Sequence, residues 1–220
     1  MNFGSAPFRA ASFLVAFCAF GLTSAAARAP KADVSSAWAA APSVRVITAD
    51  KTFSDGPITL SGTLYTPALS HKVPAIIAFQ GASTPTRNLP LFHHLTEMLP
   101  PLGIAVLVFD RRGSGKSGGK PASGSYDVLA DDGCAALKML ARDPRIDPRR
   151  IGFWGLSQGG WIAILAASRC PQTAFAISVS APMTTPAQQM NFAVANILRI
   201  HGYSQADIDQ AVGARNAVDA

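Results

Sequence analysis

The pentapeptide Gly155-Leu156-Ser157-Gln158-Gly159 lies between an apolar, strand-like run at residues 150–154 and a helix-like run at residues 160–168. A G-x-S-x-G sequence between a strand and a helix is typical of a sharp turn that lifts a serine hydroxyl out of a sheet. We expect a Cβ atom on Gly155 or Gly159 to crowd that serine. A serine becomes a good nucleophile when a nearby base takes its proton and a third group orients the base. Ser157 is therefore the candidate catalytic nucleophile.

Two backbone N–H groups are expected to stabilise the oxyanion that forms when Ser157 attacks a carbonyl group. The N–H of Gln158 lies at the start of the predicted helix, where the helix dipole also favours negative charge. The second donor is expected from the loop Phe79-Gln80-Gly81-Ala82-Ser83, which follows an apolar run. Gly81 lets this backbone fold close to the serine, so the N–H of Ala82 is the candidate second donor.

From about residue 44 onward, strand-like and helix-like segments alternate along the chain. A hairpin is predicted over residues 44–48 and 58–65, around Ser54-Asp55-Gly56-Pro57. Continuous apolar runs predict buried strands at residues 73–79, 104–109 and 174–179. Helices are predicted at residues 88–99, 126–141, 160–167, 187–200 and 204–212. This order predicts an α/β fold with a mostly parallel sheet and helices on both faces.

The first 27 residues have the pattern of a secretory signal peptide. Arg9 gives a positive start, residues 10–22 form an apolar stretch, and Ser24-Ala25-Ala26-Ala27 offers small residues for cleavage. The apolar stretch is short for a bilayer span, so we expect no stable membrane insertion after the leader is removed. An uncleaved anchor is the alternative. Export across the inner membrane of a bacterium, to the periplasm or beyond, is the predicted route.

Composition and charge exclude several classes of protein. The 220 residues are 49% hydrophobic and 15% charged, which fits one globular domain and not a disordered chain. The densest basic group, at residues 142–150, is interleaved with Asp143 and Asp147, so no nucleic-acid surface is predicted. Cys134 and Cys170 are expected to be buried small side chains and not a disulfide or metal ligands. No metal or other cofactor is predicted.

Four segments together resemble the α/β-hydrolase superfamily, closest to bacterial serine esterases and peptidases of the prolyl-oligopeptidase, serine-aminopeptidase and dienelactone-hydrolase type. They are residues 55–67, the Gln80-Gly81 loop, Phe109-Asp110-Arg111-Arg112-Gly113-Ser114-Gly115-Lys116-Ser117, and residues 150–160. The resemblance spans residues 44–182 and implies a serine hydrolase. In such proteins the loop at this position usually begins His-Gly, and here Gln80 replaces the histidine. The oxyanion donor is a backbone N–H, so this replacement does not remove it. We expect residues 110–112 to make structural ion pairs and to hold neighbouring loops, and not to contact substrate.

The same resemblance implies a catalytic acid and a histidine on loops after two further strands. After Ser157 the chain offers one histidine, His201, and three acids, Asp207, Asp209 and Asp219, all in a polar helical tail. We therefore expect the acid and the histidine beyond Ala220, with the last strands of the sheet missing. His201 as the base is the alternative, although its order relative to the acids is wrong for the family and a surface histidine at a helix end is the simpler interpretation.

The expected organisation is a signal peptide (residues 1–27), a linker (28–43), an incomplete α/β-hydrolase core (44–182) and the start of a helical lid (183–220). The first functional hypothesis is an exported serine hydrolase that cleaves a small-molecule ester or a peptide through an acyl-enzyme on Ser157. The alternative is a non-catalytic remnant or a small-molecule binding protein with the same fold. The sequence leaves the substrate and the oligomeric state open.

Overall fold

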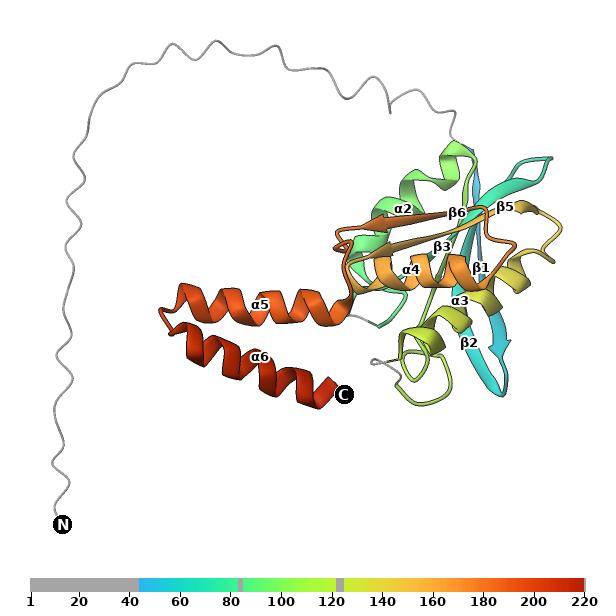
Figure 1. The fold of residues 1–220 in the computed structure, drawn as a ribbon. Coiled ribbons are helices and arrows are strands. Elements are labelled where there is room, and N and C mark those ends of the chain that lie inside the picture. Colours follow the sequence, from blue (N-terminus) through green and yellow to red (C-terminus); the bar gives the residue numbers. More distant parts are fainter. Residues whose placement is uncertain (1–43, 83–84, 122–124, 220) are drawn as a thin grey trace, which may run out of the picture. The chain divides into compact units, whose positions relative to one another are not determined.

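The computed structural model of the chain describes residues 44–82, 85–121 and 125–219, and Figure 1 shows their arrangement. The predicted signal peptide and linker lie outside the described residues. The helices and strands, in chain order, are β1 (Val46–Asp55), β2 (Ile58–Pro67), β3 (Val73–Phe79), η1 (Pro90–Phe92), α2 (His93–Met98), η2 (Pro100–Leu102), β4 (Ala105–Phe109), α3 (Tyr126–Leu140), β5 (Ile146–Leu156), α4 (Gln158–Arg169), β6 (Phe175–Val179), α5 (Pro186–Ile200) and α6 (Gln205–Asp219).

The strands of the described residues form one six-stranded sheet in the order β1-β2-β4-β3-β5-β6. β1 and β2 are antiparallel, and β2 is antiparallel to β4. From β4 through β3 and β5 to β6 all pairings are parallel. The predicted fold class, a mostly parallel sheet with helices, is confirmed.

The antiparallel hairpin is longer than its sequence pattern predicts. β1 continues from Val46 to Asp55 and pairs with β2 along its whole length, as far as Asp55 opposite Ile58. The apolar run in β1 ends at Thr48, but the strand goes on because alternate residues face solvent and tolerate polar side chains. Gly56 closes the turn with φ 54°, a conformation that glycine adopts without strain.

Helices cover both faces of the sheet, and β3 shows how the chain divides its side chains between them. Ile77 and Phe79 are buried in a cluster with residues of α3 and α4. The alternate residues, Ile76 and Ala78, are buried in a second cluster with Phe92 of η1 and with α2. Two covered faces explain why β3 reads as a continuous apolar run.

The last strand departs from its prediction. Residues 174–179 were predicted to form a buried strand, but β6 is half exposed, and Ile177 is 41% exposed. Within the described residues β6 pairs with β5 alone, so it lies at the edge of the sheet. An apolar run therefore indicated the strand correctly and its burial wrongly.

Two helices follow the sheet; α5 is close to its predicted range of 187–200, whereas α6 continues to Asp219, past the predicted end at residue 212. Thr185 and Gln188 form a reciprocal capping box at the start of α5. Asn191 of α5 donates a 2.8 Å hydrogen bond to Asn216 of α6, and Ile208 of α6 is buried. The assignment of these helices to a lid stays a prediction.

Candidate active site

Ser157 occupies the turn between β5 and α4, as its sequence context predicts. Its backbone has φ 53° and ψ −120°, and its side chain is exposed. Such a positive φ is strained for a residue with a Cβ, and strain of this kind gathers at functional sites. The Ser157 N–H donates a 2.8 Å hydrogen bond to the carbonyl of Val179 in β6. The turn is thus fixed at the carboxyl end of the parallel sheet.

The glycines beside Ser157 are required for close backbone contact. A Cβ on Gly159 would lie 2.6 Å from the carbonyl oxygen of Phe79 and 2.7 Å from that of Gln80. A Cβ on Gly155 would overlap the backbone of Gly159 itself. The nearest contacts of these added Cβ atoms are therefore with the backbone of α4 and of the chain at the end of β3, and crowding of the serine itself stays a prediction. The glycines allow α4 to start in contact with β5 and with the end of β3.

The loop that follows β3, residues 80–82, is named the Gly81 loop below. A Cβ on Gly81 would lie 3.5 Å from the Leu156 carbonyl oxygen and 3.9 Å from the Ser157 Cβ. The structure therefore brings this loop beside the nucleophile candidate, as predicted. The side chain of Gln80 is buried and its Nε2 donates to the carbonyl of Phe109. Ala82 follows at an exposed position, and its role as an oxyanion donor stays a prediction.

Arg111 joins the two parts of the candidate site. Its Nη1 donates to Gln158 Oε1 at 3.0 Å, and its Nη2 lies 3.2 Å from the carbonyl oxygens of both Gln80 and Gly81. Burial lowers the pKa of Arg111, and the charges of Tyr126 and Asp132 oppose that shift. The predicted loop-holding role of this arginine is confirmed, and its contact with Gln158 was not foreseen.

Asp110 anchors the same region through Arg87, a residue that the sequence did not single out. The Asp110 carboxylate accepts from the Arg87 backbone N–H at 2.8 Å, from its Nη2 at 3.0 Å, and from the Lys116 N–H at 2.9 Å. Burial alone would raise the pKa of Asp110, but these hydrogen bonds outweigh it and lower the pKa. Because Arg87 lies outside any recognisable motif, only the fold could reveal this pair.

Arg112 binds carboxylates away from the Gly81 loop. Its guanidinium forms hydrogen bonds to both carboxylate oxygens of Asp132 in α3, at 3.0 and 2.5 Å, and to Asp55 at the end of β1 at 2.5 Å. The hydrogen bond to Asp132 raises the pKa of Arg112 despite its burial. This network joins a helix to the hairpin and confirms the predicted structural ion pairing.

All four histidines of the chain lie among the described residues, and each is exposed. His94 contacts the ring of Trp154 and the carbonyl of Leu91. His93 Nδ1 lies 3.9 Å from Glu97 Oε1, and His201 is the C-cap residue of α5. In this part of the chain no group of three or more residues suits a metal ion, and no helix is both long and apolar enough to cross a bilayer.

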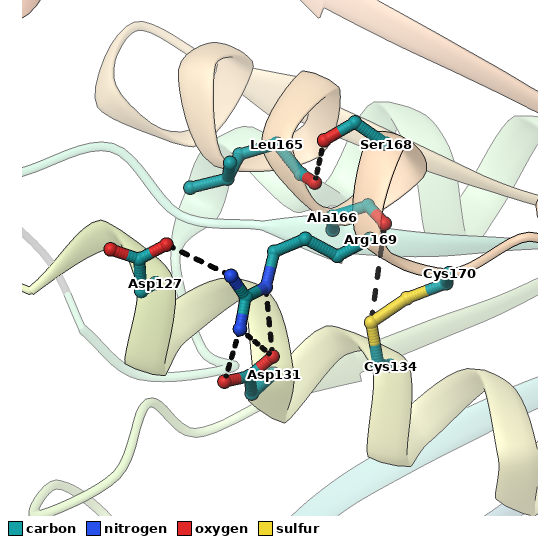
Figure 2. The surroundings of a disulfide bond; sticks show 8 residues. All are labelled: Asp127, Asp131, Cys134, Leu165, Ala166, Ser168, Arg169 and Cys170. Atoms are coloured by element: carbon teal, nitrogen blue, oxygen red, sulfur yellow. Dashed lines mark hydrogen bonds and ion pairs between the residues drawn. A yellow bond between two sulfur atoms is a disulfide. The ribbon is translucent and has the colours of Figure 1, made fainter.

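The two cysteines expected to be unpaired form a disulfide, which corrects that prediction. Cys134 of α3 and Cys170 at the end of α4 have Cα atoms 5.8 Å apart, a normal separation for a disulfide. Figure 2 shows Arg169 beside this bond, paired with Asp127 at 3.1 Å and with Asp131 at 2.8 Å. The sequence placed both cysteines in helical patterns, but a separation of 36 residues gave no sign that those helices are neighbours.

Comparison with known families agrees with this geometry. Residues 86–208, more than half of the chain, match the sequence profile of the family described as serine aminopeptidase, S33. The chain belongs to this S33 family. The matched residues include Arg87, Arg111 and Ser157, so the profile covers most of the candidate site. The predicted membership of the α/β-hydrolase superfamily is confirmed.

Relatives of this S33 chain carry the names of several enzymes. It is 32% identical over 123 residues to the thiohydrolase apmlB of Arthrinium phaeospermum, an alignment that covers 56% of this chain and 39% of that protein. The crystal structure of the α/β hydrolase GrgF from Penicillium sp. sh18 matches with a TM-score of 0.58 and 25% identity, over 70% of this chain and 53% of GrgF. The structure of the esterase Est1E from Butyrivibrio proteoclasticus, solved with ferulic acid, matches with a TM-score of 0.54 and 23% identity, over 67% of this chain and 56% of Est1E.

The chain spans 39%, 32% and 41% of the lengths of three curated relatives that it matches. The activities of those whole proteins are therefore applied to this chain only as a proposal. The match to Est1E, at 23% identity, supports the fold alone.

Proposed function

We propose that this chain is an exported serine hydrolase that cleaves an ester or a peptide bond through an acyl-enzyme on Ser157. The observation that carries the proposal is the strained turn at Ser157, φ 53°, which puts an exposed serine at the start of α4 beside the Gly81 loop. A tight turn without chemistry would not need this strain together with a second backbone loop at close range.

In the proposed reaction the Ser157 hydroxyl oxygen attacks the substrate carbonyl carbon and gives up its proton to a base. The negative charge on the former carbonyl oxygen is stabilised by the N–H groups of Gln158 and Ala82. The leaving group departs with a proton, and water then releases the acyl group from Ser157. Loss of one oxyanion donor costs about 3–4 kcal/mol of barrier in serine hydrolases. We assign no base among the described residues, because none of the histidines there is hydrogen-bonded to Ser157.

The substrate class is inferred from the relatives. A thiohydrolase at 32% identity and the Pyrococcus furiosus esterase Pf2001 at 27% identity are among them, whereas the family description names an aminopeptidase. Acyl esters and thioesters are therefore favoured over peptides. Hydrolysis of p-nitrophenyl acetate that exceeds hydrolysis of aminoacyl p-nitroanilides supports this order, and the reverse ranking would reassign the enzyme as a peptidase.

A fluorophosphonate probe, which reacts with activated serines, tests the nucleophile. A protein that carries this chain together with the expected acid and histidine is expected to be labelled, and its Ser157→Ala variant is expected to stay dark. Ser180→Ala is the matched control, because Ser180 is also an exposed serine with φ 53° and follows the adjacent strand β6. Equal labelling of the parent and Ser157→Ala would end the assignment of Ser157.

The second candidate is a binding protein that keeps the fold and does no chemistry. The observation that favours it is the lack of a histidine hydrogen-bonded to Ser157 in the described part of the chain. It predicts ester hydrolysis equal in the parent and in Ser157→Ala, a comparison that separates chemistry on the serine from weak catalysis by the oxyanion site.

Export is supported by the disulfide, since such bonds persist in oxidising compartments and are rare in the cytosol. We expect the chain, expressed in a bacterium with its own leader, to accumulate in the periplasm or the medium with a new N-terminus near Arg28. Recovery in the cytosol with Met1 intact would contradict export. Recovery in the membrane with Met1 intact would favour the anchor instead.

A further inference from the structure

Arg111 is buried, and it differs from the two partly buried arginines of the region, Arg87 and Arg112, in what it binds. Arg87 and Arg112 each pair with a carboxylate. Arg111 is only 5% exposed, yet the acceptors at hydrogen-bond distance from its guanidinium are the carbonyls of Gln80 and Gly81 and the side-chain oxygen of Gln158. A buried charge is costly unless it is paired. The position of Arg111 therefore suggests a role other than stabilising an ion pair.

The carbonyls that Arg111 holds belong to the peptide groups that carry the neighbouring N–H donors. In a trans peptide the C=O and the N–H point in opposite directions. A hydrogen bond from Arg111 to the Gly81 carbonyl therefore fixes the direction of the Ala82 N–H. The bond to Gln158 Oε1 ties the same guanidinium to the first residue of α4, whose N–H is the other candidate donor.

We propose that Arg111 is a positioning residue that sets the spacing and direction of the two oxyanion donors, Ala82 N–H and Gln158 N–H. This inference rests on the proposed function of Ser157. Arg111 touches neither substrate nor reacting atoms, and acts through the Gly81 loop and α4. Its loss should lower the rate of the chemical step and leave substrate binding almost unchanged, because the donors stabilise the transition state and not the ground state.

The matched pair of variants is Arg111→Met and Arg112→Met, adjacent arginines of which only the first holds the Gly81 loop. For Arg111→Met we expect kcat for p-nitrophenyl acetate to fall about 10- to 100-fold with KM within about threefold of the parent. Arg112→Met should lower the melting temperature and keep kcat within the same threefold range. A purely structural role would give Arg111→Met the same pattern as Arg112→Met, and that result would overturn the proposal.

A second readout does not depend on turnover. The backbone ¹⁵N order parameter of Gly81 should be about 0.85 in the parent and in Arg112→Met, and should fall below about 0.6 in Arg111→Met. An unchanged value in Arg111→Met overturns the proposal even if the parent is inactive. Equal hydrolysis by the parent and Ser157→Ala would instead refute the proposed function, with the order parameter still deciding whether Arg111 holds the loop.

If Arg111→Met does not fold, Arg111→Lys takes its place. The lysine ammonium keeps the charge but cannot span three acceptors in the fixed fork of a guanidinium. An intermediate kcat with a lowered Gly81 order parameter supports positioning. Parent values of both quantities in Arg111→Lys would overturn it, because charge alone would then suffice.

Discussion

Gly159 in the first turn of α4 and Phe79 at the end of β3 are in backbone contact, since a Cβ on Gly159 would lie 2.6 Å from the Phe79 carbonyl oxygen. Gly159→Ala must therefore push α4 away from the end of β3. We expect this variant to lose about 1–3 kcal/mol of unfolding free energy through overpacking, and to lose fluorophosphonate labelling of Ser157. Urea unfolding and the probe measure the two effects.

Gly213→Ala is the control for that substitution. Gly213 lies in α6, and a Cβ there would meet no atom within 4 Å. Alanine should stabilise that helix by up to about 1 kcal/mol and leave labelling unchanged. Full labelling of a stable Gly159→Ala variant would show that the close approach of α4 and β3 is not needed at Ser157.

The disulfide between Cys134 and Cys170 closes a loop that contains β5, Ser157 and all of α4. We expect its reduction to cost about 2–4 kcal/mol of unfolding free energy, because the cross-link restricts the unfolded chain. Urea unfolding of the leaderless protein with and without dithiothreitol measures this. A Cys134→Ala/Cys170→Ala variant should show no response to the reductant. Free thiols on both cysteines of the untreated, secreted protein would contradict the bond.

The sequence predicts those features of this protein that depend on local pattern. Its continuous apolar runs located β3 and β4, and the G-x-S-x-G context located the turn at Ser157. What it misses depends on distance between segments. Cys134 and Cys170 are 36 residues apart, and Arg111 and Gln158 are 47 apart, so nothing local reports that they meet. The prediction that β6 is buried failed for a related reason, because an apolar run does not say how many strands pair with it or which helices cover it.

Asp143 provides a test of stability against pH. Hydrogen bonds from the Arg145 side chain, at 3.0 Å from Nε and 2.9 Å from Nη2, lower its pKa despite burial. The Arg145 backbone N–H at 3.1 Å and Lys51 Nζ of β1 at 3.0 Å lower it further. A carboxyl whose pKa is lower in the folded state stabilises it fully above the unfolded pKa of about 4, and this contribution is lost as pH falls further. Asp143→Asn should therefore cost about 2–3 kcal/mol at pH 7, with the difference from the parent shrinking below about pH 4.

Urea unfolding from pH 7 down to pH 2 measures that difference. Asp147→Asn is the comparison, because the arginine partners of Asp147, Arg149 and Arg150, have side chains 91% and 53% exposed. Exposed pairs of this kind contribute little, so its unfolding curve should change less than that of Asp143→Asn. A gap between the parent and Asp143→Asn that stays constant down to pH 2 would exclude ionised Asp143 as the stabilising group.

The exposed edge of β6 predicts self-association of the polypeptide of residues 28–220. Unpaired backbone groups on an apolar edge strand offer a template for another chain, and Ile177 in this strand is 41% exposed. Ile177→Lys should shift the protein toward monomer in size-exclusion chromatography with light scattering, because a lysine on an edge strand opposes pairing. Ile164 of α4 is also 41% exposed, but its helical backbone is already hydrogen-bonded, so Ile164→Lys should leave the association unchanged. A monomeric parent, or an equal response of the two variants, would mean that the edge of β6 does not drive association.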